Sequence, residues 1–198
     1  MHKSMEPAFF QMEPCFKKHK NKKNVEIEMM LGRISNGRFD TNIGKDNFQK
    51  ILMALDKYTK WEKVEVNTYD AYYGAKNLRT NRYEDDTQES VTKKRLDVVD
   101  YSAQDLPLDV RFAVSTETKC EPPEDTEYDS VRSKKRSSYI RKGLRIDCTV
   151  VTGTPDDKDA EDTDEYQVEL EIMDVKSVKN KRTLYNHIYK IKDLCECL

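Results

Sequence analysis

Four glutamates stand in two Glu-x-Glu pairs near opposite ends of the chain, Glu26 with Glu28 and Glu169 with Glu171. Apolar residues alternate with them in both segments, which is the pattern of a β-strand with one polar and one apolar face. Side chains two residues apart in a strand point to the same face, roughly 6.5–7 Å from each other. If the two strands pair, four carboxylates converge on one patch. Like charges that close raise the pKa of at least one carboxyl unless a cation neutralises them.

A divalent metal ion is the simplest such cation for the two glutamate pairs. Hard ions such as Mg²⁺ and Mn²⁺ prefer carboxylate oxygens as ligands. The alternative is that each glutamate strand is the solvated face of a half-exposed sheet, which is the commoner use of this alternation. The choice between the two depends on whether other strands bring cations to the same place.

Basic residues alternate on several segments between the two glutamate pairs. Lys134 and Arg136 share one face of a strand, and Arg145 and Asp147 share one face of the next. Further cations are Arg79 and the consecutive Lys93, Lys94 and Arg95; strand parity does not show which of these three points inward. Glu117 adds another acid.

Taken singly, charged residues of this kind are more often solvated surface groups, and residues 134–136 are also consistent with a nucleic-acid patch. Taken together, they describe carboxylates for a metal ion surrounded by Lys and Arg. Phosphoryl transfer needs this combination, because negative charge gathers on the transferring phosphate. No Gly-rich phosphate-binding loop in the sequence competes for the role.

The composition suits a sheet with a polar interior. The chain of 198 residues fits one domain, and it is 36% hydrophobic and 36% charged, whereas roughly 45–50% apolar residues are usual. Disorder would explain the difference, but the regular alternation and an aromatic content of 9% argue against it. In a closed sheet, half of each strand can be polar without facing bulk solvent. The net charge of -2 does not by itself predict a partner.

Short strands separated by turn residues account for most of the chain. They are expected over residues 25–31, 64–73, 77–83, 89–101, 110–119, 130–140, 145–151 and 166–173, at the spacing of an all-β barrel or sandwich. Helical periodicity predicts one helix from a cap at Asp46 to about Trp61, and another over residues 180–198. Residues 1–24 are expected to form an N-terminal arm, residues 25–198 a single domain, and residues 152–163 a mobile acidic hairpin loop.

Cysteine usage and hydropathy indicate the compartment. The five cysteines are scattered and form neither a Cys-x-x-Cys pair nor a Cys/His cluster. With no signal-like apolar run near the N-terminus, a reducing intracellular compartment is expected. No segment approaches the length and hydrophobicity of a membrane span, so no membrane partner is expected.

The ordered set of charged strands resembles the metal-dependent RNA 5′-triphosphatases of fungal and large-DNA-virus mRNA capping, which are triphosphate tunnel metalloenzymes. The segments that carry the resemblance are, in order, residues 25–31, 115–117, 134–139, 144–149 and 168–171. The likeness spans about residues 25–175, and the compactness of the chain is closer to the minimal viral members. The fold that it implies is mainly β (α+β), an eight-stranded antiparallel β-barrel tunnel with flanking helices.

The resemblance also implies a role for each charged residue. Glu26, Glu28 and Glu171 would be direct ligands of Mg²⁺ or Mn²⁺, with Glu169 holding a metal-bound water or a neighbouring cation. The residues that would grip the triphosphate are Arg79, one lysine of Lys93 and Lys94, Lys134, Arg136 and Arg145. Glu117 would orient the attacking water, and Asp147 would fix a neighbouring Arg or Lys. The last strand departs from the family pattern Glu-x-Glu-x-Glu, because its first position is Gln167, whose amide cannot supply charge.

The activity implied by the resemblance is hydrolysis of the γ-phosphate at the 5′ end of nascent RNA, the first step of mRNA cap formation. The substrates would be 5′-triphosphate RNA and, as a side activity, NTP, and an RNA guanylyltransferase is a possible partner. The protein would be intracellular, either a viral protein in a host cell or nuclear if cellular. Two alternatives stay open: a hydrolase of inorganic tripolyphosphate or thiamine triphosphate, and a non-catalytic module that binds polyphosphate or RNA.

Overall fold

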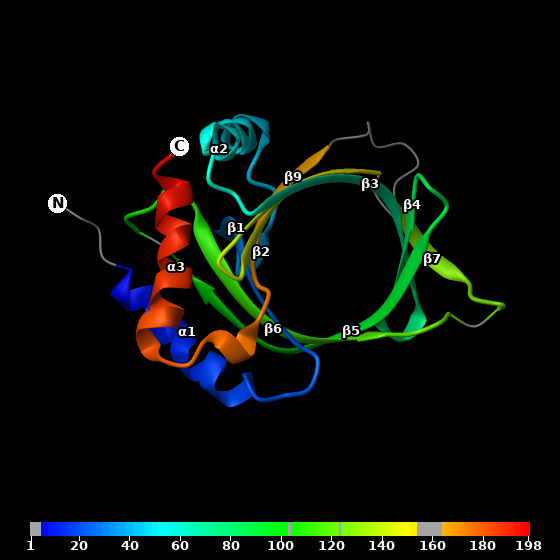
Figure 1. The fold of residues 1–198 in the computed structure, drawn as a ribbon, viewed down its shortest axis with the longest axis horizontal. Coiled ribbons are helices and arrows are strands. Elements are labelled where there is room, and N and C mark those ends of the chain that lie inside the picture. The colour runs from blue at the N-terminus through cyan, green and yellow to red at the C-terminus, as the bar shows by residue number, and fades with distance from the viewer. Residues whose placement is uncertain (1–4, 103, 123, 154–163) are drawn as a thin grey trace.

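The strand that closes the sheet is β1, Val25–Ser35, which pairs with β6, Asp109–Lys119, on one side and with β9, Glu165–Ile172, on the other. The computed structural model describes residues 5–102, 104–122, 124–153 and 164–198. Around the sheet the strands run in the order β1, β6, β5 (Gln88–Tyr101), β4 (Leu78–Tyr83), β3 (Lys63–Gly74), β7 (Tyr128–Arg141), β8 (Leu144–Thr152) and β9 and return to β1, with antiparallel neighbours throughout. The described part of the chain therefore forms a closed eight-stranded barrel, seen end-on in Figure 1, which confirms the expected fold class.

The other barrel strands lie close to the segments in which alternation was expected. One further strand, β2, Arg38–Asp40, was not expected, and it pairs with the end of β1 through a tight turn at Asn36 and Gly37. Both turn residues have positive φ, as a two-residue hairpin requires.

The β1–β2 hairpin depends on Gly32. A Cβ at this position would lie 2.1 Å from the carbonyl oxygen of Asp40 and 2.5 Å from the ring of Phe39. Because the first of these atoms is backbone, a side chain could not be accommodated by a rotamer change alone. Gly32 therefore lets the hairpin fold back closely against β1.

Three helices cover one side of the barrel: α1, Glu6–His19; α2, Lys45–Lys57; and α3, Lys181–Cys195. Two short 3-10 helices, η1 Ala75–Asn77 and η2 Val175–Ser177, complete the described elements. α2 and α3 correspond to the two expected helices, although α2 starts at Gly44 as its cap and Asp46 lies in its first turn. No described helix combines the length and the apolar character needed to cross a membrane.

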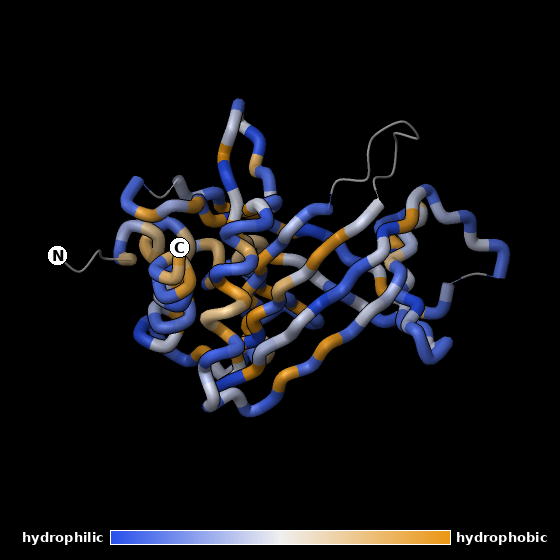
Figure 2. Tube along the Cα trace, turned by 90° about the horizontal axis from the view of Figure 1, so that it is seen from above, coloured by the Kyte–Doolittle hydropathy of each residue, from blue (hydrophilic) through white to orange (hydrophobic). Residues whose placement is uncertain are grey.

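The hydrophobic core lies between the barrel wall and the helices. Ile27, Met29 and Leu31 on β1 are fully buried and belong to the same cluster as Phe112 on β6 and Ile188 on α3. Figure 2 shows hydrophobic and hydrophilic residues alternating along the strands, with hydrophobic residues gathered toward the helices. The polar face of each strand is left for the interior of the barrel, which accounts for the low hydrophobic content of the chain.

The segment expected to be an N-terminal arm contains α1, and the sequence analysis missed this helix. Phe9, Met12 and Phe16 of α1 are buried in the core cluster, so the helix packs as part of the domain. Its side chains also reach the barrel, because Lys18 Nζ and His19 Nε2 lie 2.8 and 2.9 Å from Oδ2 of Asp97 on β5. Of the acidic loop expected over residues 152–163, residues 154–163 lie outside the described part of the chain.

Candidate active site inside the barrel

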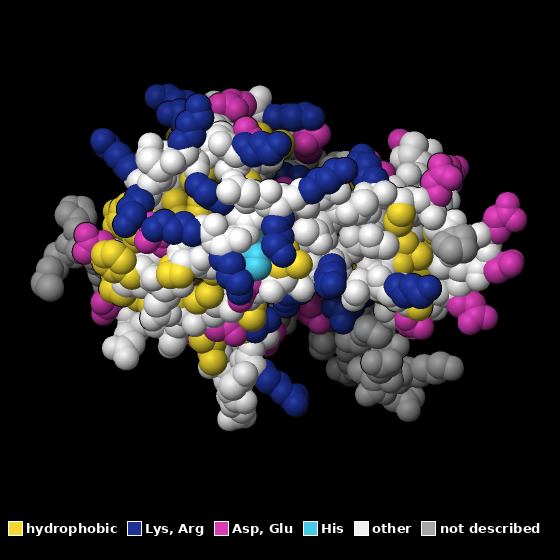
Figure 3. All heavy atoms as spheres, turned by 90° about the horizontal axis from the view of Figure 1, so that it is seen from below, with side chains coloured by type: hydrophobic (Ala, Val, Ile, Leu, Met, Phe, Trp, Pro, Cys, Tyr) yellow, Lys and Arg dark blue, Asp and Glu magenta, His cyan; other side chains and the backbone are white. Residues whose placement is uncertain are grey.

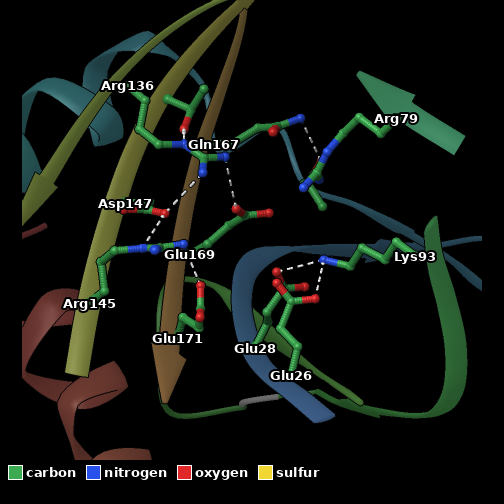
Figure 4. A network of polar contacts seen from close by, with 12 residues as sticks. Glu26, Glu28, Arg79, Lys93, Arg136, Arg145, Asp147, Gln167, Glu169 and Glu171 are labelled. Atoms are coloured by element: carbon green, nitrogen blue, oxygen red, sulfur yellow. Dashed lines mark hydrogen bonds and ion pairs between the residues drawn. The ribbon is translucent and has the colours of Figure 1, made fainter. Parts of the chain in front are cut away.

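Strand register brings the charged residues to the inner face of the barrel. Arg145 is opposite Glu171 and Asp147 is opposite Glu169 on the pair β8–β9, while Glu28 is opposite Glu171 on the pair β1–β9. Directly opposite residues point to the same face of a sheet, so these side chains share one surface. Figure 4 shows them converging from different strands.

Three carboxylates form the tightest acidic cluster in the described part of the chain. Glu26, Glu28 and Glu171 each place a carboxylate oxygen within 4.8 Å of the other two. These are the three residues expected to bind a metal ion, and two of them come from β1 and one from β9. Their oxygens are the ligand type that Mg²⁺ and Mn²⁺ prefer, so the donor set fits a hard divalent cation.

Lys93 supplies positive charge to this cluster. Its Nζ lies 2.7 Å from Oε2 of Glu26 and 2.8 Å from Oε1 of Glu28. Oε2 of Glu26 is buried, and Lys93 is the only cation that contacts it among the described residues. One lysine is therefore shared between two carboxylates, and the cluster keeps capacity for a further cation.

Burial sets the ionisation of the acidic cluster. Burial raises the pKa of the Glu28 carboxyl. The positive charge of Lys93 opposes this shift, and the negative charge of Glu26 adds to it. Burial also raises the pKa of Glu171, with Arg145 opposing the shift and Glu28 adding to it. The pKa of Lys93 is raised because the attraction of Glu28 and Glu26 outweighs the opposing effect of burial. Bringing these carboxylates together has a cost in free energy that a bound cation would reduce.

Two arginines form a network that is joined to the acidic cluster through Glu171. Arg145 donates from Nε to Oδ2 of Asp147 at 3.0 Å and also pairs with Glu171. Arg136 approaches the same Asp147 oxygen at 3.2 Å and Oε2 of Glu169 at 3.7 Å, and its Nε donates to Oγ1 of Thr149 at 3.1 Å. Asp147 thus holds both guanidinium groups, as expected for a residue that fixes a neighbouring cation.

Arg79, Glu117 and Lys134 lie on other parts of the inner wall. Arg79 donates to Oε2 of Glu117 at 3.0 Å, and its Nε is buried without a partner among the described residues. Lys134 has no carboxylate partner in the described part of the chain, and its Nζ lies 5.8 Å from the centre of the Tyr73 ring. Both cations therefore have donors that remain available to a phosphate.

The structure separates the three consecutive basic residues of β5. Lys93 is opposite Glu117 on β6 and reaches Glu26 and Glu28, so it points into the barrel. Lys94 is opposite Thr116, points to the outer face and is exposed. Of the expected site residues, Lys94 is thus not brought to the cluster, because neighbouring residues in a strand face opposite sides.

Gln167 occupies the position where the family pattern has a glutamate. Its Nε2 donates to Oε2 of Glu165 at 3.0 Å and lies 3.3 Å from Oγ1 of Thr41. Glu165 in turn lies 3.5 Å from Arg132, two residues before Lys134 on the inner face of β7. The acid absent from position 167 is therefore found two residues earlier in the strand.

Sequence reasoning missed three inner-face residues. Arg132 continues the alternation of Lys134 and Arg136, and that parity could have identified it. Tyr69 is opposite Lys134, and its ring centre lies 5.8 Å from the Arg136 guanidinium. Ser115 is buried opposite Glu26, with an Oγ that has no partner among the described residues. No sequence signal distinguishes Tyr69 or Ser115 from ordinary strand residues.

The chain matches a known protein family over most of its length. The profile of the family described as mRNA capping enzyme, beta chain (mRNA triphosphatase), matches residues 40–194, more than three quarters of the chain. The match begins after Glu26 and Glu28, so it is the structure that brings these two residues to the other site residues. No curated protein sequence matches the chain at a significant level.

Solved structures with the same fold include an RNA triphosphatase and a capping enzyme triphosphatase. The chain is similar to the S. pombe Pct1 RNA triphosphatase, with 14% identity, 96% of this chain and 92% of that chain covered, and a TM-score of 0.80. For Pct1 in complex with the Spt5 CTD the identity is 14%, the TM-score is 0.79, and 96% of this chain and 91% of that chain are covered. For the Mimivirus capping enzyme triphosphatase the identity is 17%, the TM-score is 0.66, and 98% of this chain and 99% of that chain are covered. At these identities the likeness establishes the shared fold.

Proposed function

The chain belongs to the mRNA triphosphatase family of mRNA capping enzyme beta chains and is an RNA 5′-triphosphatase, a phosphohydrolase; we propose that it removes the γ-phosphate inside the barrel with the help of a divalent cation. The observation that carries this proposal is the acidic cluster of Glu26, Glu28 and Glu171, whose oxygens lie within 4.8 Å of one another. It lies in a closed barrel near Arg136 and Arg145, which supports a cation site next to a triphosphate site.

The cation would be held by the carboxylates of Glu26, Glu28 and Glu171. Their hard oxygen ligands suit Mg²⁺ or Mn²⁺, and the sharing of one lysine between Glu26 and Glu28 supports the fit, because it leaves the two carboxylates with excess negative charge. When bound, the cation would stabilise negative charge on the phosphoryl group being transferred. Lys93 now lies between two of these carboxylates, and a bound cation would free its ammonium to contact a phosphate oxygen.

The basic side chains on the inner face of the barrel would bind and orient the triphosphate. Arg136 and Arg145 present planar guanidinium groups whose orientation Asp147 fixes through contacts of 3.2 and 3.0 Å. A guanidinium held in this way can contact two phosphate oxygens at once. Arg79 and Lys134 would bind the remaining phosphate oxygens with their available donors, because the negative charge of a triphosphate is spread over all three groups.

Glu117 would orient the attacking water. Arg79 holds one of its carboxylate oxygens at 3.0 Å, and the position opposite Lys93 places it one strand away from β1, which carries Glu26 and Glu28. A carboxylate positioned by an arginine can accept a hydrogen bond from water and so direct its lone pair toward the phosphorus. Glu169, whose Oε2 lies 3.7 Å from Arg136, would help Asp147 to hold that guanidinium in place.

One assay tests the proposal against its alternatives. Phosphate release is measured from γ-labelled triphosphate RNA, ATP, inorganic tripolyphosphate and thiamine triphosphate, each with Mg²⁺, Mn²⁺ or no metal. We expect metal-dependent phosphate release from RNA. Release from ATP is expected as a side activity, because the inner-face Lys and Arg residues would bind the triphosphate group that both substrates share. Release from the two small triphosphates but not from RNA would favour a small-molecule hydrolase. The absence of phosphate release from all four substrates would favour a non-catalytic module that binds polyphosphate or RNA.

Association with an RNA guanylyltransferase is proposed as well, because the family is described as one chain of a capping enzyme. Co-purification of the two proteins from cells that express both would support this association. Separate elution at micromolar concentration would argue against it.

A further inference from the structure

The chain between α1 and β1 carries a short basic run at the edge of the barrel. Lys20, Lys22 and Lys23 follow the end of α1, and Val25 starts β1 two residues later. The segment is fixed to β6, because the Glu117 amide donates to the Asn24 carbonyl oxygen at 3.0 Å. In Figure 1 it passes along the rim of the barrel and enters β1. The run therefore lies at a mouth of the barrel, three residues from Glu26.

Lys94 lies next to this run on the outer wall. It is opposite Thr116 on β6, and Thr116 is opposite Val25 on β1, so the three residues face the same side of adjacent strands. Since neighbouring strands are about 4.8 Å apart, the backbone of Lys94 lies roughly 10 Å from Val25. We call the surface formed by Lys20, Lys22, Lys23 and Lys94 the basic rim.

The lysines of the basic rim have no acidic partner among the residues that the structure describes. Within the part of the chain that the structure describes, none of the four makes an ion pair, and Lys22, Lys23 and Lys94 are exposed. Their neighbours Lys17 and Lys18 pair with Glu13 and Asp97. An internal structural role thus explains the latter two lysines. Of the rim lysines, Lys20 lies over the Phe16 ring at 5.9 Å, and no ion pair with a described residue occupies any of the four.

The charges of the molecule are arranged around the barrel with a clear asymmetry. The turn between β4 and β5 carries the exposed acids Glu84, Asp85 and Asp86. Figure 3 shows Asp and Glu gathered at the end away from the helices, and Lys and Arg spread over the rest of this face. A polyanion that leaves the barrel is repelled by the acidic end and attracted toward the side of α1.

We propose that the basic rim binds the RNA chain that follows the 5′ triphosphate, through its backbone phosphates. This inference rests on the RNA triphosphatase function stated above and adds the path of the RNA outside the barrel. Lysines suit the task, because flexible ammonium groups bind successive phosphates without reading the base sequence. The rim thereby favours triphosphates on RNA over free nucleotides, which have no following phosphates.

The test compares substrates with and without an RNA chain. In a Lys20→Ala, Lys22→Ala, Lys23→Ala variant, kcat/KM for a triphosphate RNA of about 20 nucleotides is expected to fall about tenfold at low salt, through KM. The slope of log kcat/KM against log salt concentration is expected to become shallower by about 2, at roughly 0.7 for each phosphate that the variant no longer binds. Hydrolysis of inorganic tripolyphosphate is expected to stay at the wild-type rate, which also shows that the variant is folded.

A matched control removes the same charge elsewhere. Lys45, Lys57 and Lys60 lie in or just after α2, which covers the same side of the barrel as α1 but is separated from it in Figure 1. Their triple alanine variant is expected to keep the wild-type salt slope. An unchanged slope in the rim variant, or an equal change in both variants, would overturn the inference. These outcomes are distinct from failure of the function itself, in which wild-type protein would release no phosphate from RNA.

Discussion

Glu28 on β1 and Glu171 on β9 are direct cross-strand partners at the pairing that closes the barrel. Two acids at opposite positions of adjacent strands repel each other, and burial adds to the cost by raising the pKa of both. The segments involved lie more than 140 positions apart in the chain, so this pairing forms only when the sheet closes. The acidic cluster and the closed barrel are therefore parts of one arrangement.

Glu28→Gln is expected to lower the rate of RNA hydrolysis by at least about a thousandfold, because the amide keeps the shape but removes an anion that a hard metal requires. Phosphate release at saturating Mn²⁺ measures the loss, and thermal unfolding of the variant verifies that it is folded. Metal-dependent turnover close to that of the wild type would show that Glu28 is not a ligand.

Lys93→Met is expected to destabilise the metal-free protein by about 2 kcal/mol, since Glu26 and Glu28 lose the cation that they share. For a domain of this size the midpoint of thermal unfolding falls by several degrees. Mn²⁺ should then raise the midpoint by more than it does in the wild type, because it replaces the missing charge.

The control for Lys93→Met is Lys94→Met, which changes the adjacent residue on the outer face of β5. It is expected to change neither the midpoint nor the response to Mn²⁺. A response to Mn²⁺ that is the same in all three proteins would mean that Lys93 and the metal do not share a site.

Arg136→Lys is expected to reduce kcat by about tenfold to a hundredfold while the protein stays folded. Lysine keeps the positive charge but cannot contact Asp147, Glu169 and Thr149 at once with a planar group. Steady-state kinetics with triphosphate RNA measure the change. An unaltered kcat would indicate that the guanidinium geometry plays no part in the reaction.

Asp97 is expected to make the stability of the packing between α1 and the barrel depend on pH. Its bond to Lys18, and then its bond to His19, lower the pKa of Asp97 from 3.8 to about 2. A lowered native pKa means that the carboxylate stabilises the folded protein above about pH 4, and that this contribution is lost as the pH falls toward 2.

Urea denaturation of the wild type and Asp97→Asn at several pH values measures this contribution. The difference in unfolding free energy between the two proteins should be largest at and above pH 4 and should shrink toward pH 2. A difference that does not change with pH over this range would rule out ionised Asp97 as its source.

Strand parity was sufficient to predict most of the inner face. Glu26 and Glu28, like Lys134 and Arg136, alternate with residues of another kind, so the period of two shows which side chains share a face. The three consecutive cations at 93–95 carry no such information, because they occupy both faces. The register shift between Arg95 and Asp97 adds a bulge that the sequence does not reveal.

The helix α1 was missed because its proline content resembles that of an irregular segment. Pro7 lies in the first turn, where proline is well tolerated, but Pro14 lies inside the helix, where it usually ends one. The buried Phe9, Met12 and Phe16 follow helical spacing, so a periodicity signal was present. Tertiary packing of that face against the barrel outweighs the cost of Pro14.

The position of a metal ion tests the central claim most directly. Crystals grown with MnCl₂ and measured near the manganese absorption edge should show one strong anomalous peak inside the barrel. The account predicts this peak between the carboxylates of Glu26, Glu28 and Glu171, at direct coordination distance from their oxygens. A peak coordinated by other residues, or an interior without a peak at millimolar Mn²⁺, would contradict it.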